Sequence, residues 1–205
     1  MRTFPDVRMR ALVEQAAYAQ RLIQEHEYPA ALVELRALDG RLAQLGLQSV
    51  WVKWALCVAH DLSDNSLAAL DKINEALSLD PFSEANHVSH ETVVKRLRTY
   101  LLEATEGDPE VARVYQRLLQ EDECDVSSHL AWARFLIHGR RHHEAEEVLQ
   151  AITTLAPASL DAWNLRARVA RDRGDAHTAA GCEAESKLRA AQPVALGIPV
   201  SGGRS

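Results

Sequence analysis

The chain has little of several residue types, and each shortage excludes a class of protein. Its 205 residues include only 9 Gly and 7 Pro, which is few for a β-rich fold with many tight turns. The three cysteines, Cys57, Cys124 and Cys182, lie far apart and form no CxxC or Cys/His spacing, so we expect free thiols in a reducing compartment. No run approaches 18 apolar residues, so no membrane-spanning helix is expected.

Positive charge is also scarce. The chain has 23 Lys and Arg against 29 Asp and Glu, a net charge of −6 and an isoelectric point near 5.8. This balance argues against a duplex nucleic-acid partner, because such binding depends on counterion release by basic side chains. The first twenty residues lack the continuous apolar core of a signal peptide. We therefore expect a cytoplasmic protein with no nucleic-acid partner and no membrane insertion.

What the chain does contain favours helices. Apolar residues make up 47% of it, enough to build a folded core rather than a disordered chain. Ala, Leu, Glu and Arg dominate, and these residues have high helix propensity. The composition predicts an all-α protein.

One pattern of helix ending and restarting occurs twice. Residues 74–85 read NEALSLDPFSEA, and residues 149–163 read LQAITTLAPASLDAW. Pro81 and Pro157 cannot continue a helix, so each is expected to turn the chain into a new element. A small residue precedes each proline by twelve positions, Ala69 in the first case and Ala145 in the second. We expect Asp161 and Ser127 to cap restarting helices.

A period of 34 residues connects these signals. It relates Ala145 to Ala179 and Arg134 to Arg168, and a step in the other direction relates Ala145 to Val111. Periods of this length are typical of helical repeat arrays. The segments that carry the pattern are EYPAA (27–31), EALSLDP (75–81), EGDPEVA (106–112) and RGDAHTAA (173–180).

These segments resemble the tetratricopeptide repeat (TPR), a 34-residue helix-turn-helix with a small residue in its second helix and Pro at its end. Trp163 stands where the signature Trp of that family stands. The resemblance implies an all-α, right-handed superhelical solenoid of about five degenerate repeats. The chain departs from the family pattern at Arg166 and Ala167, which replace the usual Leu-Gly pair, and at Cys124, which replaces a terminal Pro.

The resemblance divides the chain into one repeat array and a tail. We predict an α-solenoid over residues 1–191 and a flexible tail over 192–205, with an extended strand packed back on the solenoid as the alternative for the tail. A hairpin of this size cannot bury its apolar face alone, so neighbouring units must stack. The predicted units are 12–45, 50–83, 84–125 with an extended first helix, 126–159 and 160–191.

The sequence contains no strong signature of a catalytic or metal site. No phosphate loop, dinucleotide fingerprint or nucleophile elbow occurs. His142 and Glu146 have the i, i+4 spacing of a metal pair, and His138 precedes them across a turn. A metal-dependent or redox activity at His138, His142 and Cys124 is the less favoured reading, because no spacing fixes a third ligand. We expect no enzyme activity and no cofactor.

The resemblance places function on the concave surface, lined by the first helix of each hairpin. Arg134 and Arg168 occupy equivalent positions in successive units and are expected side by side in this groove. Arg suits bidentate recognition of carboxylates, and Arg and Trp are enriched at binding hot spots. The predicted groove residues are Trp51, Trp54, Arg134, His138, Asn164, Arg168 and Arg171.

Alternatives remain for these side chains. Trp51 and Trp54 can equally be core residues, and the arginines can pair with Asp161, Asp172 or Asp175 on a solvated face. The clamp with which some family members grip chaperone tails needs Lys and Asn at groove positions that are apolar in most units here, such as Leu97 and Leu130. That specificity is therefore not inherited.

The leading hypothesis is a non-enzymatic adaptor or scaffold that holds a protein or peptide partner, including carboxylate-bearing segments, in the groove. A bacterial secretion-type chaperone is the alternative, although five readable units are more than such proteins usually have. A homodimer through the incomplete end repeats is a further open possibility for the partner, because end repeats expose apolar faces.

Overall fold

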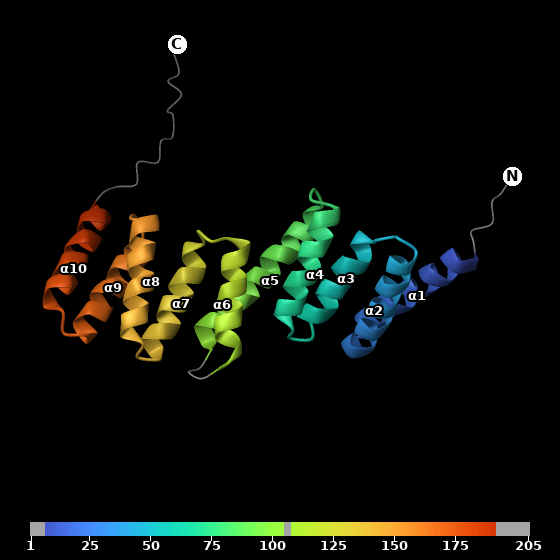
Figure 1. The fold of residues 1–205 in the computed structure, drawn as a ribbon, viewed down its shortest axis with the longest axis horizontal. Helices are drawn as coiled ribbons and strands as arrows, with labels where there is room; N and C mark the ends of the chain where they lie inside the picture. Colours follow the sequence, from blue (N-terminus) through green and yellow to red (C-terminus); the bar gives the residue numbers. More distant parts are fainter. Residues whose placement is uncertain (1–6, 105–107, 192–205) are drawn as a thin grey trace, which may run out of the picture. The chain divides into compact units, whose positions relative to one another are not determined.

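The described part of the chain is built from helices connected by short turns. The computed structural model describes residues 7–104 and 108–191, and the predicted tail at 192–205 lies outside them. The described residues form ten helices (Figure 1). They are α1 (Val7–Gln24), α2 (Tyr28–Gln44), α3 (Val50–Asp61), α4 (Ser66–Leu79), α5 (Glu84–Glu103), α6 (Glu110–Glu121), α7 (Val126–His138), α8 (His142–Leu155), α9 (Leu160–Asp172) and α10 (Ala176–Ala191).

The chain divides into two compact units. The first comprises residues 1–100 and 112–118, and the second comprises residues 101–111 and 119–205. In the first unit, α1 packs on α2, α3 packs on α4, and the two hairpins stack through α2 and α3. In the second, α7 packs on α8, α9 packs on α10, and the hairpins stack through α8 and α9. The predicted all-α class, with stacked TPR-like hairpins, is confirmed within each unit.

The turns inside the hairpins repeat one conformation. In four of them, the residue two positions before the second helix has a left-handed backbone: His26 (φ 64°), Asp64 (φ 55°), Arg140 (φ 56°) and Gly174 (φ 76°). The next residue then donates its amide to a carbonyl five positions earlier, as Glu27 does to Leu22 at 2.8 Å and Asp175 does to Ala170 at 2.9 Å. This bond satisfies a carbonyl that the helix end leaves open.

The small residues of the repeat pattern are buried in the second helix of each hairpin. Ala31, Ala69 and Ala145 are fully buried, and Ala179 is 4% exposed. A larger side chain at these positions would push the paired helices apart, because interiors are close-packed. The spacing signal in the sequence therefore reports helix packing.

The two prolines follow helix ends as predicted, but the expected cap is wrong. Helices α4 and α8 end at Leu79 and Leu155, two residues before each proline. Helix α9 begins at Leu160, so its cap is Ser159, whose Oγ accepts from the amide of Ala162 at 3.3 Å. Asp161 lies inside the first turn, where its carboxylate is free to contact another helix. The expected cap Ser127 is wrong as well, because α7 begins at Val126 and its cap is Asp125, whose Oδ1 accepts from the Ser127 amide at 3.0 Å.

Trp163 is a packing residue in the second unit. Its Nε1 donates to the carbonyl of Pro157 at 2.9 Å, and the guanidinium of Arg189 lies 4.7 Å from its ring centroid. Arg189 also donates to the carbonyl of Pro157. These contacts join the α8–α9 connection to the last turns of α10.

Candidate functional site

The seven predicted groove residues are divided between the two units. Trp51 and Trp54 lie on α3 of the first unit, and the other five lie on α7 and α9 of the second.

The two indoles of the first unit pack on its core. Trp51 and Trp54 are half-buried against a cluster that includes Leu35, Leu38 and Leu56. The Nε1 of Trp54 donates to the Oγ of Ser89 on α5 at 3.1 Å, which satisfies its only polar group. These contacts agree with the core alternative for the pair, and a role in partner binding stays a prediction.

Arg134 and Arg168 have separate ionic partners. Arg134 Nη2 on α7 donates to Asp161 Oδ2 on α9 at 3.1 Å, whereas Arg168 Nε lies 3.9 Å from Asp172 Oδ2 on its own helix. Asp161 and Arg168 are seven residues apart, about 10 Å along the helix axis. The predicted side-by-side arrangement of the two guanidinium groups stays a prediction. The pairing with Asp161 and Asp172 agrees with the solvated-face alternative.

Asn164 and Arg171 complete the polar surface of α9. Asn164 Oδ1 accepts from Ser186 Oγ on α10 at 2.8 Å. Arg171 Nε lies 3.5 Å from Glu183 Oε1, also on α10. His138 is exposed in the last turn of α7. All five second-unit predictions therefore lie at least partly in solvent.

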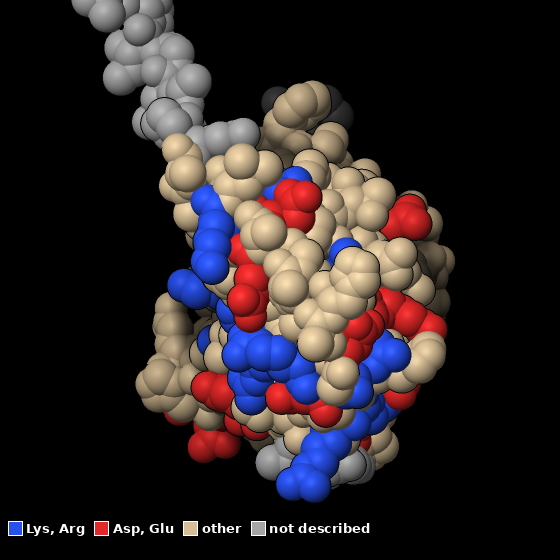
Figure 2. All heavy atoms as spheres, turned by 90° about the vertical axis from the view of Figure 1, so that its left-hand side faces the viewer, with Lys and Arg blue, Asp and Glu red and all other residues tan. Residues whose placement is uncertain are grey.

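We call the residues Arg134, Asp161, Asn164, Arg168 and Arg171 the arginine face. Their ion pairs are exposed, with side-chain exposures of 41% for Arg134 and 59% for Arg168. Pairs of this kind are worth at most about 1 kcal/mol each, so an incoming carboxylate can displace the internal one at little cost. Figure 2, which views the second unit from its α9–α10 end, shows Lys and Arg in a band interleaved with Asp and Glu.

Sequence reasoning missed a polar network in the first unit. Lys53 Nζ on α3 contacts Asp39 Oδ2 on α2 at 2.8 Å and Glu75 Oε2 on α4 at 2.6 Å, and its side chain is only 14% exposed. Burial opposes the charge of Lys53, but its two carboxylate partners raise its pKa overall. The network therefore connects α2, α3 and α4. Because its ammonium group is already paired and mostly buried, Lys53 is poorly accessible to a binding partner.

A second missed contact joins α3 to α5. Arg96 Nη1 lies 3.3 Å from Asp61 Oδ1 and donates to the Asp61 carbonyl at 3.0 Å. Trp54 and Ser89, and likewise Asp61 and Arg96, are 35 positions apart. This offset near the repeat period is the signal that could have found both pairs.

The candidate metal residues form an incomplete set. His142 Nδ1 and Glu146 Oε2 are buried and have no hydrogen-bond partner within the described residues. The other oxygen of Glu146 accepts from Arg166 Nε at 2.8 Å, so this carboxylate already serves an ion pair between α8 and α9. Residues 7–104 and 108–191 contain no cluster of three or more His, Cys, Asp or Glu suited to a metal ion.

The thiols have contrasting environments. Cys57 and Cys182 are buried, and Cys124 is exposed in the α6–α7 connection. Burial, together with the charge of Asp61, raises the pKa of Cys57 to about 12. Burial likewise raises the pKa of Cys182, against a lowering effect of Arg166. Both buried thiols therefore stay protonated and unreactive at neutral pH.

No family model matches the chain, and no curated protein matches it. Similar solved structures include MamA (residues 41 to the end) from Desulfovibrio magneticus RS-1, at 13% identity, TM-score 0.40, and coverage of 87% of this chain and 94% of that one. Another is YrrB, described as a TPR protein with an unusual peptide-binding site, at 15% identity and TM-score 0.41, with coverage of 90% of this chain and 92% of that one. A third is the TPR domain of P58(IPK), at 15% identity and TM-score 0.41, with coverage of 86% of this chain and 50% of that one.

No helix in the described ranges is both long and apolar enough to cross a bilayer.

Proposed function

We propose that this protein is a non-enzymatic adaptor that binds an acidic segment of a partner protein on the arginine face. The observation that carries the proposal is a set of exposed ion pairs, Arg134 with Asp161, Arg168 with Asp172 and Arg171 with Glu183, whose arginines lie on α7 and α9 of one unit. Weak exposed pairs keep these guanidinium groups charged and oriented but available. A cytoplasmic location accompanies the proposal and rests on the sequence alone.

The spacing of the arginine face suits a particular ligand geometry. Arg134 is held at Asp161, about 10 Å along α9 from Arg168. Three residues of a polyproline II segment make one turn and span about 9 Å, so carboxylates at positions i and i+3 of such a segment lie on one side and match the two arginines. Asn164 lies between them on α9 and offers an amide for the backbone of the same segment.

The direct test removes the charge at Arg168. We expect Arg168→Ala to weaken binding of a partner captured from the native host about tenfold or more, because truncating one side of a desolvated ion pair costs about 2–5 kcal/mol. Isothermal titration calorimetry with the purified partner measures this loss. The double variant Arg134→Ala/Arg168→Ala should abolish capture.

Arg10→Ala is the matched control. Arg10 pairs with Glu14 at i, i+4 and is exposed, just as Arg168 pairs with Asp172, but it lies on α1 of the first unit. It should leave the affinity unchanged. Equal losses for Arg10→Ala and Arg168→Ala would show a general effect of net charge, and an unchanged affinity for Arg168→Ala would refute the proposed site.

A further inference from the structure

One edge of the first unit exposes several large apolar side chains. Helices α1, α3 and α5 begin at this edge, and α2 and α4 end there, so the α2–α3 and α4–α5 connections lie on the same side (Figure 1). We call it the connection edge. Its exposed large apolar side chains, from the α2 end to the α5 start, are Leu45, Leu47, Leu79, Phe82 and Val88.

Phe82 is the most exposed of these side chains, at 93%. The turn that carries it is ordered by local bonds: the Phe82 amide donates to Asp80 Oδ1 at 3.2 Å, and the carbonyl of Pro81 lies 2.8 Å from His87 Nε2. Because this ring lies in water on an ordered turn, it does not contribute the stabilising free energy that a buried Phe side chain normally supplies. It is therefore presented for a contact outside its own fold.

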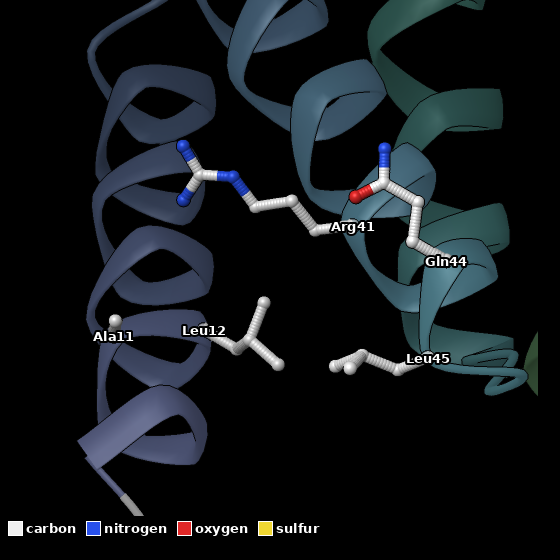
Figure 3. Close-up of a pocket in the computed structure, with 5 residues that line it drawn as sticks. All are labelled: Ala11, Leu12, Arg41, Gln44 and Leu45. Carbon is white, nitrogen blue, oxygen red and sulfur yellow. The ribbon is translucent and has the colours of Figure 1, made fainter.

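A pocket of about 320 Å³ opens on the same edge, between the first turns of α1 and the last turn of α2. It is lined by Ala11, Leu12, Arg41, Gln44 and Leu45. Figure 3 shows the side chains of Leu12 and Leu45 pointing toward one another and Arg41 extending from α2 toward α1. Apolar cavities of about 150 Å³ already bind benzene, so a phenyl ring fits this space.

The charges around ring and pocket are complementary. Asp80 and Glu84 flank Phe82 in the sequence DPFSE, and Arg41 stands at the pocket. A guanidinium there can pair with a flanking carboxylate and also stack on the ring. The pocket is thus suited to an aromatic side chain with acidic neighbours, which is the chemistry of residues 80–84.

We propose that two copies of this chain pair along their connection edges, with Phe82 of each copy in the α1–α2 pocket of the other. Ring and pocket lie on one edge of the same unit, so a single two-fold axis makes both contacts at once, and the surface is self-complementary. Leu47 and Leu79 lie between the two contacts and exclude water around them. This dimer is independent of the arginine face, which lies on the second unit.

The first experiment measures self-association by sedimentation velocity over a concentration series. The wild-type chain should shift from monomer to dimer as concentration rises. Phe82→Ala should raise the dissociation constant about a hundredfold, because each dimer loses two anchors worth about tenfold each. Leu188→Ala, at an exposed leucine of α10 in the second unit, is the matched control and should leave the constant unchanged.

The second experiment tests the pairing of ring with pocket. Leu45→Glu places a charge at the pocket mouth and should block dimerisation of that variant by itself. A mixture of Phe82→Ala and Leu45→Glu should dimerise more tightly than either variant alone, because the mixed dimer keeps one intact contact. A mixture no tighter than its components would overturn the pairing.

Charge reversal supplies a third readout. Arg41→Glu and Glu84→Arg should each weaken the dimer, and the double variant should recover most of the loss. Circular dichroism should show unchanged folding for every variant, since the altered side chains are exposed. A wild-type chain that stays monomeric throughout the series, or whose pocket takes up a DPFSE peptide without any self-association, overturns the proposal.

Discussion

The Lys53 network of the first unit and the arginine face of the second use charged side chains in opposite ways. In the first unit, Lys53, Asp39 and Asp61 are turned into the contacts between helices, with side-chain exposures of 14%, 24% and 12%. In the second unit, Arg166 forms one enclosed pair with Glu146 between α8 and α9, but Arg134 and Arg168 on α7 and α9 remain in solvent. The same hairpin architecture therefore supports charges that hold helices together in one unit and charges available to a partner in the other.

The physical difference lies in solvation. A charge removed from water must be compensated by well-placed partners, and losing one partner then leaves the other stranded. A charge in water gains little from its partner and loses little without it. The free energy of unfolding should thus depend strongly on the enclosed charges around Lys53 and weakly on the exposed charges of the arginine face. Partner binding should show the reverse dependence.

The largest expected effect is at Lys53. Lys53→Ala leaves Asp39 without its cation and Glu75 with Lys72 alone, and we expect it to lower the free energy of unfolding by about 3 kcal/mol. Urea denaturation followed by circular dichroism measures this change. A loss below about 1 kcal/mol would mean that the network behaves like a surface pair.

A rescue variant separates charge from packing at this site. The triple variant Lys53→Met, Asp39→Leu, Glu75→Leu replaces the network by apolar side chains and should recover most of the lost stability. If it is no more stable than Lys53→Ala, the packing of the lysine stem, rather than the stranded carboxylates, explains the loss.

The next effect is a pH dependence confined to the first unit. His60 on α3 is 4% exposed, its Nε2 lies 3.4 Å from Arg36 Nη2, and its Nδ1 has no hydrogen-bond partner within the described residues. Burial, with the charges of Arg36 and Lys72, lowers the pKa of His60 from its usual 6.5. The neutral ring is therefore favoured in the folded protein.

The sign of the dependence follows from this lowered pKa. As pH falls below about 6.5, the unfolded chain binds a proton that the folded chain does not, so the free energy of unfolding decreases. The decrease is at most about 1.4 kcal/mol per pH unit, and this histidine contributes no slope above that range. His60→Gln should flatten the slope in denaturation series at several pH values. His177→Gln, at an exposed histidine of α10, should not.

The smallest effect is expected on the arginine face. Arg134→Ala removes an exposed ion pair with Asp161 and should change the free energy of unfolding by less than about 0.5 kcal/mol. The same urea series measures it. A loss as large as that of Lys53→Ala would erase the contrast between the units and assign Arg134 a structural role.

Prediction from the sequence succeeded where the signal was local or periodic. Ala145 and Ala179 are small because helices cross there, and Pro157 ends a helix through its missing amide, so both features can be identified without coordinates. The cap of α9 was wrong because Ser159 and Asp161 have equally suitable side chains. Only the position at which the helix begins distinguishes them.

The candidate site was less accessible to sequence reasoning. Equivalent positions brought Arg134 and Arg168 to neighbouring helices of one unit, but spacing cannot say that Arg134 reaches Asp161 while Arg168 turns to Asp172. The half-buried state of Trp54 likewise depends on Ser89, a residue of another helix. Which of several partners a long side chain contacts depends on where packing places the helices that carry them.

The sequence by itself determined that this chain forms helical hairpins with small residues at their crossings, because propensity and a repeat period act through neighbours along the chain. Only the tertiary structure decided that His26, Asp64 and Arg140 adopt the left-handed backbone conformation that glycine favours, as Gly174 does. It also decided that Lys53 is enclosed and that Phe82 is exposed. Such outcomes depend on which surfaces the stacked helices cover, and that is settled by contacts between residues remote in sequence.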